Sequence, residues 1–235
     1  MLHRLFLLAL ICLGTLGPAA AAERYEERAT HDPDGIGKFY LGREIAQVMG
    51  PGGIPWLERD EREFEEKPSV VIDALQLKAG DTVADLGAGS GYYSFRLAPV
   101  VGPTGKVLAI DIEERMLGVI RDRVARQEIR NVETVRSTAS DPNLAAGSVD
   151  LVLMVDVYHE LAFPYEMMRG VVTALKPGGR VALVEYRQED PNVAIKAVHK
   201  MSERQIIREM QAVGLKHQRT VGSLPLQHLV IFTKP

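Results

Sequence analysis

From about residue 81 onward, short apolar runs alternate with longer segments in which apolar residues recur every three or four positions. The short runs are rich in Val, Leu and Ile, which predicts strands covered by helices on both faces. They lie at residues 82–86, 106–110, 132–135, 150–155, 180–185, 215–221 and 228–233. The periodic segments predict helices at residues 91–101, 116–127 and 164–175, and one more from the capping box at Ser202 to Gly214. This alternation predicts an α/β domain with a mainly parallel sheet.

The preceding segment, residues 23–66, is more polar and contains many turn residues. Spaced apolar positions over residues 39–49 predict a short helix there. The charged run at residues 58–67 predicts the exposed start of a longer helix that continues to Leu75. We therefore separate residues 23–66, as an N-terminal segment, from a domain that spans residues 67–235.

The first 22 residues have the pattern of a targeting segment. A basic start is followed by an apolar stretch from Leu5 to Leu16 and then by four alanines, Ala19 to Ala22. These features are typical of a secretory signal peptide, and the apolar stretch is short for a membrane span. We predict that residues 1–22 are a signal peptide cleaved after Ala22, that the chain is exported to the periplasm or secreted, and that the mature chain has no membrane contact. An uncleaved anchor is the alternative.

A glycine-rich turn follows the first strand of the domain, with the sequence DLGAGSG at residues 85–91. Glycines let the backbone approach a ligand, and the next helix directs free N–H groups at it. About twenty residues further on, Asp111 closes the second strand, where a carboxylate can accept hydrogen bonds from both hydroxyls of a ribose. A dinucleotide pattern requires glycine three residues after Gly89, and Tyr92 stands there. The glycine-rich turn and Asp111 together therefore predict a site for a nucleoside, without a site for a pyrophosphate.

The glycine pattern resembles the first motif of the class I S-adenosylmethionine (SAM) methyltransferases. The resemblance extends from about Asp81 to the C-terminus and includes SVDLV at residues 148–152 and LKPGGR at residues 175–180. It implies a Rossmann-like, doubly wound sheet of seven mostly parallel strands with a C-terminal antiparallel hairpin. It also implies SAM as the cofactor and methyl transfer to a small-molecule acceptor.

The resemblance places the cofactor at the ends of the first three strands. Three glycines would lie along its amino-acid end, with an acid near the ammonium group, and the later residues would contact the ribose and adenine. The assigned residues are Asp85, Gly87, Gly89, Gly91, Asp111, Ile112 and Asp141. For Gly91 and Ile112, a role in packing is the alternative.

The fourth strand ends in the sequence DVYHE at residues 156–160, which in the resembling family lies beside the transferable methyl group. His159 is the candidate catalytic base, because an imidazole can accept a proton near neutral pH. A helix cap or a core hydrogen bond is its alternative role. Tyr158 and Asp156 are candidate groups that position the acceptor.

Residues ahead of the first strand often cover the cofactor in this family, so the resemblance implies that residues 23–66 form a lid. Tyr40, Arg43 and Trp56 are its candidate contacts. For Trp56, fixing the segment onto the core is the alternative. The loop after the fifth strand, which holds His199, is a second candidate for acceptor contacts.

Composition narrows the choice of partners. The net charge of −3 argues against a surface that binds nucleic acid by neutralising phosphates. The only cysteine, Cys12, lies in the predicted signal peptide, so the mature chain would have no disulfide and no thiolate metal site. We assign no metal ligands, and the sequence predicts no oligomeric state.

Export and SAM use conflict, because SAM is made in the cytosol. Two alternatives therefore stay open. One is a periplasmic module that binds a nucleoside or SAM without turnover. The other, disfavoured by the glycine spacing and the terminal hairpin, is an NAD(P)-dependent oxidoreductase.

Overall fold

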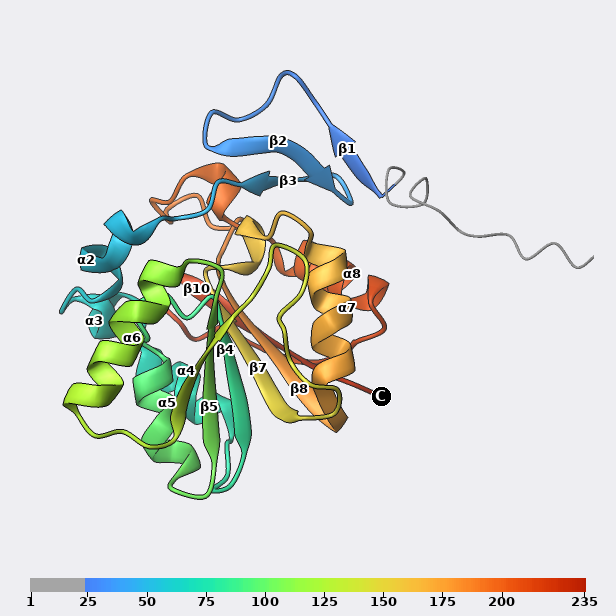
Figure 1. Ribbon diagram of the computed structural model, residues 1–235. Helices are drawn as coiled ribbons and strands as arrows, with labels where there is room; N and C mark the ends of the chain where they lie inside the picture. Colours follow the sequence, from blue (N-terminus) through green and yellow to red (C-terminus); the bar gives the residue numbers. More distant parts are fainter. Residues whose placement is uncertain (1–23) are drawn as a thin grey trace, which may run out of the picture.

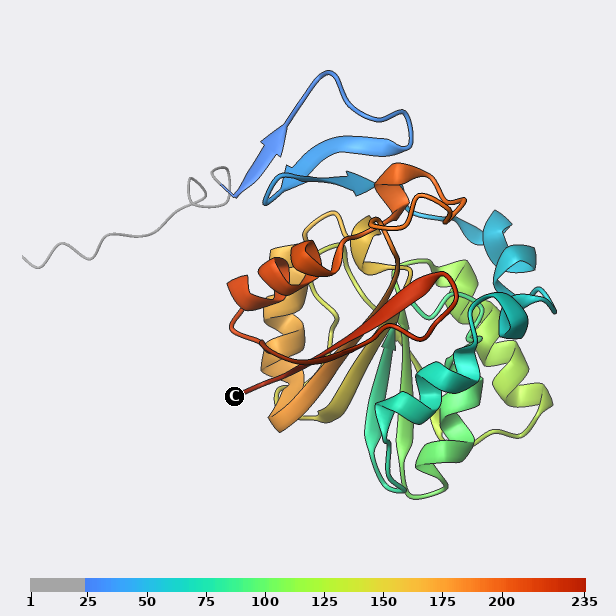
Figure 2. The same cartoon turned by 180° about the vertical axis from the view of Figure 1, so that it is seen from behind.

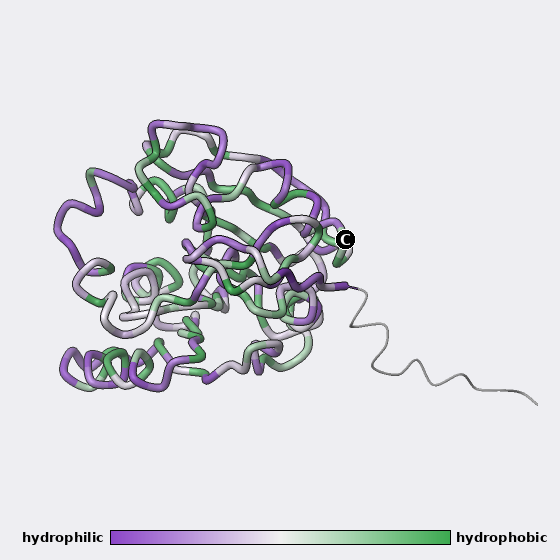
Figure 3. The backbone as a smooth tube through the Cα atoms, turned by 90° about the horizontal axis from the view of Figure 1, so that it is seen from above, coloured by the Kyte–Doolittle hydropathy of each residue, from purple (hydrophilic) through white to green (hydrophobic). Residues whose placement is uncertain are grey.

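A computed structural model describes residues 24–235, and the predicted signal peptide lies outside them. A seven-stranded sheet flanked by helices forms the body of the molecule, and a small three-stranded sheet lies over one end of it (Figure 1). Figure 3, seen from above, shows hydrophilic stretches at the outer loops. Among the described residues, the helices are all too short or too polar to cross a bilayer.

The large sheet has the strand order β6-β5-β4-β7-β8-β10-β9. β10 runs antiparallel to both β8 and β9, while the pairs among β4 to β8 are parallel. The fold class predicted from the sequence is therefore confirmed. The strands are β4 (Thr82–Leu86), β5 (Lys106–Asp111), β6 (Val132–Arg136), β7 (Val149–Val155), β8 (Leu175–Tyr186), β9 (Lys216–Val221) and β10 (Gln227–Thr233).

Helices cover both faces of this sheet, on opposite sides in Figures 1 and 2. One face packs against α4 (Pro68–Leu75), α5 (Ser94–Val101) and α6 (Glu114–Arg126). The other packs against α7 (Pro164–Ala174) and α8 (Glu203–Ala212). Successive strand residues such as Val83 and Ala84 belong to different cores, as the two-residue period of a strand requires. The apolar runs of the sequence are thus buried on both sides.

The small sheet consists of β1 (Tyr25–Glu27), β2 (Gly35–Tyr40) and β3 (Arg43–Ala46), all antiparallel. The helix predicted over residues 39–49 is wrong, because β2 and β3 form a hairpin. Its two turn residues, Leu41 and Gly42, have φ angles of 46° and 83°. A pair with positive φ matches the twist of a tight hairpin and ends a helical pattern. Apolar spacing alone did not reveal this turn.

The stretch between the small sheet and the domain contains short elements. They are η1 (Pro51–Gly53), α2 (Ile54–Leu57) and α3 (Arg62–Glu65). The predicted long helix from residue 58 to Leu75 is interrupted, since Lys67 has a φ of 52° and α4 begins at Pro68. Proline disfavours a helical conformation in the residue before it and suits the first turn of a helix.

Candidate functional site

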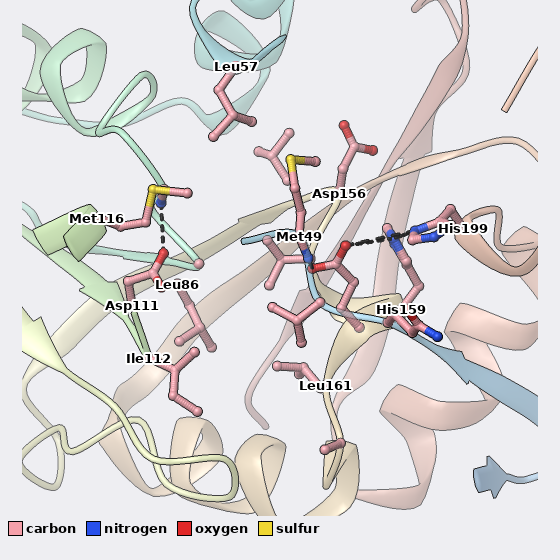
Figure 4. A pocket seen from close by; sticks show the side chains of 18 of the residues that line it. Met49, Leu57, Leu86, Asp111, Ile112, Met116, Asp156, His159, Leu161 and His199 are labelled. Carbon is pink, nitrogen blue, oxygen red and sulfur yellow. Dashed lines mark hydrogen bonds and ion pairs between the residues drawn. The ribbon is translucent and has the colours of Figure 1, made fainter. Parts of the chain in front are cut away.

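A cavity of about 610 Å³ opens at the carboxyl ends of the central strands, beneath the N-terminal segment. The chain order of the strands reverses between β4 and β7, and open α/β sheets bind ligands outside such a point. Figure 4 shows Asp111 and Ile112 on one side of the cavity and His159 and His199 on the other. We call these sides the Asp111 end and the His159 end.

At the Asp111 end, the turn after β4 contributes Gly87 and Gly89 to the cavity wall. Their φ angles are 77° and 55°, which favour glycine. A Cβ atom on Gly87 would lie 2.4 Å from Val157, and one on Gly89 would lie 2.8 Å from Leu57. The turn therefore leaves room for a ligand only because it lacks side chains.

Gly91 is placed differently from the other two glycines. It does not line the cavity, and its φ of 85° again favours glycine. A Cβ there would lie 2.7 Å from the ring of Phe95. This geometry fits the packing role that the sequence left as the alternative.

The Asp111 carboxylate stands at the end of β5 and lines the cavity. One oxygen accepts a hydrogen bond of 2.8 Å from the Gly89 amide, and the other accepts one of 2.9 Å from the Glu113 amide. Burial raises the pKa of Asp111, while these two amides act in the opposite direction. A carboxylate accepts about four hydrogen bonds, so both oxygens retain a lone pair for ligand hydroxyls. The neighbouring Ile112 is part of the same wall.

Two other acids assigned to the cofactor do not line the cavity. Asp85 is buried and accepts a hydrogen bond of 2.6 Å from the Ser94 hydroxyl, and burial raises its pKa to about 6. Asp141 is exposed, and its carboxylate accepts from the Asn143 amide at 2.8 Å. The loop reaches the cavity through Thr138 and its neighbours instead. A cofactor contact by Asp85 or Asp141 stays a prediction.

The His159 end is a chain of buried polar groups. Nδ1 of His159 lies 2.6 Å from an oxygen of Glu185, at the end of β8, and Nε2 lies 3.1 Å from Nδ1 of His199. The 3₁₀ turns η2 (Tyr158–Glu160) and η3 (Ala197–His199) position the two histidines. The second Glu185 oxygen accepts from the Tyr158 amide at 3.0 Å. Since a carboxylate accepts at Nδ1, the hydrogen of a neutral His159 ring lies there, and the lone pair is on Nε2, the atom next to His199.

Glu160 completes this end, and sequence reasoning missed it. One carboxylate oxygen lies 3.8 Å from His159 Nε2 and 3.8 Å from His199 Nδ1. The other accepts from the Met49 amide at 3.2 Å. Burial raises the pKa of Glu160 to about 7, and His159 opposes that rise. Its position directly after His159 was the only signal in the sequence.

The two candidate positioning groups have different places. Tyr158 is fully buried outside the cavity wall, and its hydroxyl donates to Glu209 at 2.7 Å. The geometry therefore does not bring the Tyr158 side chain to the acceptor. Asp156 does line the cavity, with a φ of 52° and a pKa raised well above the usual range by burial. One of its oxygens accepts from Gln227, and the other has no partner among the described residues.

The N-terminal segment covers the cavity with residues other than most of those expected. Trp56 lines the wall, with the Arg59 guanidinium 3.6 Å from its ring centre. Tyr40 is buried away from the cavity. The Arg43 side chain is 9% exposed; it pairs with Glu209 at 2.8 Å and donates to the His159 carbonyl at 3.1 Å. The further lining residues of this segment are Asp34, Gln47, Val48, Met49, Leu57 and Arg62.

A family model described as a methyltransferase domain matches residues 77–221. The ubiquinone/menaquinone biosynthesis C-methyltransferase UbiE of Pseudomonas putida is 31% identical over 127 residues, which cover 54% of this chain and 50% of that protein. An arsenite methyltransferase of Halobacterium salinarum is 33% identical over 112 residues, or 48% of this chain and 29% of that protein. The chain therefore spans about half or less of the length of these curated relatives.

Two solved structures have the same fold. A SAM-dependent methyltransferase from Aquifex aeolicus superimposes with a TM-score of 0.75 at 26% identity, over 80% of this chain and 100% of that chain. The [4+2]-cyclase SpnF superimposes with a TM-score of 0.62 at 12% identity, over 72% of this chain and 80% of that chain. The second likeness concerns the fold alone.

Proposed function

Because the chain belongs to the methyltransferase domain family and uses SAM as its methyl donor, we propose that it methylates a small molecule bound in the cavity described above. The observation that supports this proposal is the difference between the two ends of the cavity. A volume of about 610 Å³ lies within the range of a pocket for one drug-sized ligand. Cofactor and acceptor must share this volume, so the acceptor is compact. A nucleic-acid acceptor is not compact in this sense, and we therefore do not propose one.

We assign SAM to the Asp111 end. A turn without side chains at Gly87 and Gly89 leaves room for the amino-acid end, and the free lone pairs of Asp111 fit the two ribose hydroxyls. Ile112 and Thr138 line the wall where the adenine would lie. When bound, SAM supplies a methyl group on a positively charged sulfur.

We assign the acceptor to the His159 end. A hydroxyl or amine acceptor must lose a proton as its electron pair forms the bond to the methyl carbon, and the donor's carbon–sulfur bond breaks with its electrons left on sulfur. Nε2 of His159, Nδ1 of His199 and the near oxygen of Glu160 lie together at this wall. We assign proton acceptance to these three groups together. Glu185 orients the His159 ring through Nδ1 and would stabilise its charged form.

The rest of the wall favours an acceptor with an apolar part. Met49, Trp56, Val157 and Leu161 are among the apolar side chains that line the cavity. Apolar walls with a few polar groups are typical of sites for small molecules. The relative from Pseudomonas putida is named for ubiquinone and menaquinone biosynthesis, and a ring with a hydroxyl group would suit this wall. A phenol or hydroquinone is therefore the acceptor class that we propose.

Export is a separate proposal that rests on the sequence of residues 1–22. In this view the mature protein starts at Glu23 and works in the periplasm or outside the cell. Residues 23–66 then form the cover of the cavity, and residues 67–235 form the methyltransferase domain. Mass spectrometry of the native protein should find Glu23 as the first residue, give or take one position.

Two measurements on the purified protein test the proposed function. Calorimetry should show one SAM site, with no comparable binding of NAD(P). Labelled SAM should then transfer its methyl group to some members of a panel of phenols, hydroquinones, amines and thiols. Binding of SAM without transfer to any member would favour the non-catalytic module, and transfer only to a protein or nucleic acid would contradict the small-molecule acceptor.

A further inference from the structure

We propose that His159, Glu160 and His199 bind a divalent transition-metal ion, such as Zn²⁺, at the His159 end of the cavity. The three side chains each offer one ligand atom, and these atoms lie within 4.8 Å of one another. Two imidazoles and one carboxylate form a ligand set known from catalytic zinc sites. The sequence alone assigned no metal ligands, because it contains no thiolate pair and because His199 is 40 positions from His159.

The spacing of the three ligand atoms fits an ion placed between them. The edges of the triangle measure 3.1 Å between the two imidazole nitrogens and 3.8 Å from each nitrogen to the carboxylate oxygen. Ligand atoms at about 2.0–2.1 Å from a tetrahedral zinc ion are about 3.3 Å apart. Small side-chain shifts, mainly of the Glu160 carboxylate, would therefore complete the site.

Groups around the triangle hold the ligands in the required state. The Glu185 carboxylate accepts from His159 Nδ1 at 2.6 Å, so Nε2 presents its lone pair to the ion. An outer carboxylate of this kind is the usual partner of a metal-binding histidine. The Met49 amide occupies one oxygen of Glu160 and leaves the other for the ion. With two neutral imidazoles, the carboxylates of Glu160 and Glu185 balance a charge of 2+.

Three protein ligands leave one position open, and the three residues all line the cavity. An acceptor hydroxyl can take that position. With the ion bound, the three side chains are its ligands and no longer the proton acceptors: the ion favours the deprotonated form of such a hydroxyl, whose proton leaves to solvent, and it fixes the oxygen in place. This catalytic role rests on the proposed function, whereas metal binding itself does not.

The test uses tag-free, chelator-treated protein in two titrations. Calorimetry measures the binding of ZnCl₂, and visible absorption measures the binding of CoCl₂. We expect one ion per chain and the absorption of a tetrahedral Co²⁺ site. His199→Ala and Glu160→Gln should weaken Zn²⁺ binding by at least tenfold, because each removes one of three ligands. Glu185→Gln should weaken it by about 10–100-fold, the usual loss for an outer partner. His217→Ala is the matched control, since that histidine is exposed and its one hydrogen-bond partner among residues 24–235 is Thr220.

Equal Zn²⁺ affinities for the wild type and His199→Ala would overturn the proposal, as would a loss in His217→Ala of the same size. Circular dichroism identifies variants that fail to fold. His199 is partly exposed, so its substitution is the one among the three ligands that should disturb folding least. SAM calorimetry on the same samples separates the two proposals. A protein that binds SAM and transfers methyl groups but binds no Zn²⁺ retains the proposed function and lacks the metal site.

Discussion

The two ends of the cavity are built in different ways. The Asp111 end consists of the turn after β4 and the end of β5, two neighbouring strands joined by a hydrogen bond from Gly89 to Asp111. The His159 end combines a backbone amide from the N-terminal segment, two 3₁₀ turns and the end of β8. The proposed cofactor site is therefore encoded in one short stretch of chain, whereas the proposed acceptor site depends on contacts between distant stretches. Substitutions at the two ends should separate these properties.

The largest effect is expected at the His159 end. His159→Ala should leave SAM affinity unchanged and lower turnover by roughly 10²–10⁴-fold, the scale of a lost acid–base group. The loss should be greatest for acceptors that have a proton on the attacking atom, as measured with labelled SAM. A thiolate acceptor should be nearly indifferent. Equal losses for both acceptor types would assign a structural role to His159.

The dependence of the His159 end on distant segments is tested at Arg43. Its guanidinium is buried against Glu209, a fully buried acid of α8. Arg43→Met should lower the free energy of unfolding by about 3–5 kcal/mol, because it leaves a buried charge without its partner. Urea titration measures this loss. Arg24→Met is the control, since its pair with Glu166 is about one-third exposed and should contribute no more than about 1 kcal/mol.

Asp111→Ala should affect only the other end. Removal of the carboxylate should weaken SAM binding by about 1–3 kcal/mol, since the ribose hydroxyls lose their acceptor. Calorimetry with SAM measures this change, and Zn²⁺ titration of the same variant should give the wild-type affinity. Unchanged SAM affinity in a folded variant would remove Asp111 from the ribose contact.

The smallest effect concerns Asp85 beneath the glycine turn. Burial raises its folded-state pKa to about 6, above the usual value of 3.8. The folded protein therefore binds this proton more tightly than the unfolded chain. As the pH rises from about 4 to about 6, loss of the proton from Asp85 lowers the free energy of unfolding. Asp85→Asn keeps an acceptor for Ser94 and removes this cost, so its gain in stability should be about 2 kcal/mol larger at pH 8 than at pH 4.5. Urea titrations at pH 4.5 and pH 8 measure the difference, and an equal gain at both values would contradict it.

Much of the main sheet could be predicted because its strands are continuous apolar runs between helices. The glycine turn and Asp111 were equally readable, since both depend on local chain geometry. The hairpin at Leu41 and Gly42 was missed, because its apolar spacing also fits a helix and only the positive φ angles decide. Side-chain direction was a further limit. The η2 turn directs Tyr158 into the protein and His159 toward the cavity, and strand periodicity does not continue through such a turn.

The partners of His159 were beyond sequence reasoning for a different reason. Glu185 is 26 positions away and His199 is 40 positions away, so only the fold brings them to the ring. Glu160 is adjacent in the chain, but its burial under Met49 depends on the N-terminal segment. Buried polar groups of this kind need tertiary contacts to be recognised, and those contacts leave no spacing pattern in the sequence.

The buried pair of Arg43 and Glu209 also limits the route by which molecules enter and leave. Lifting the small sheet would break this pair and pull on the His159 carbonyl, which makes that motion rare. Val48, Trp56 and Ile112 line the same cavity with exposed apolar side chains instead. Motions of the loops that hold such exposed residues take about nanoseconds to microseconds. Product release should therefore depend on motions of these exposed residues. A bulkier side chain at one of them would lengthen the residence time of the product without changing the rate of methyl transfer.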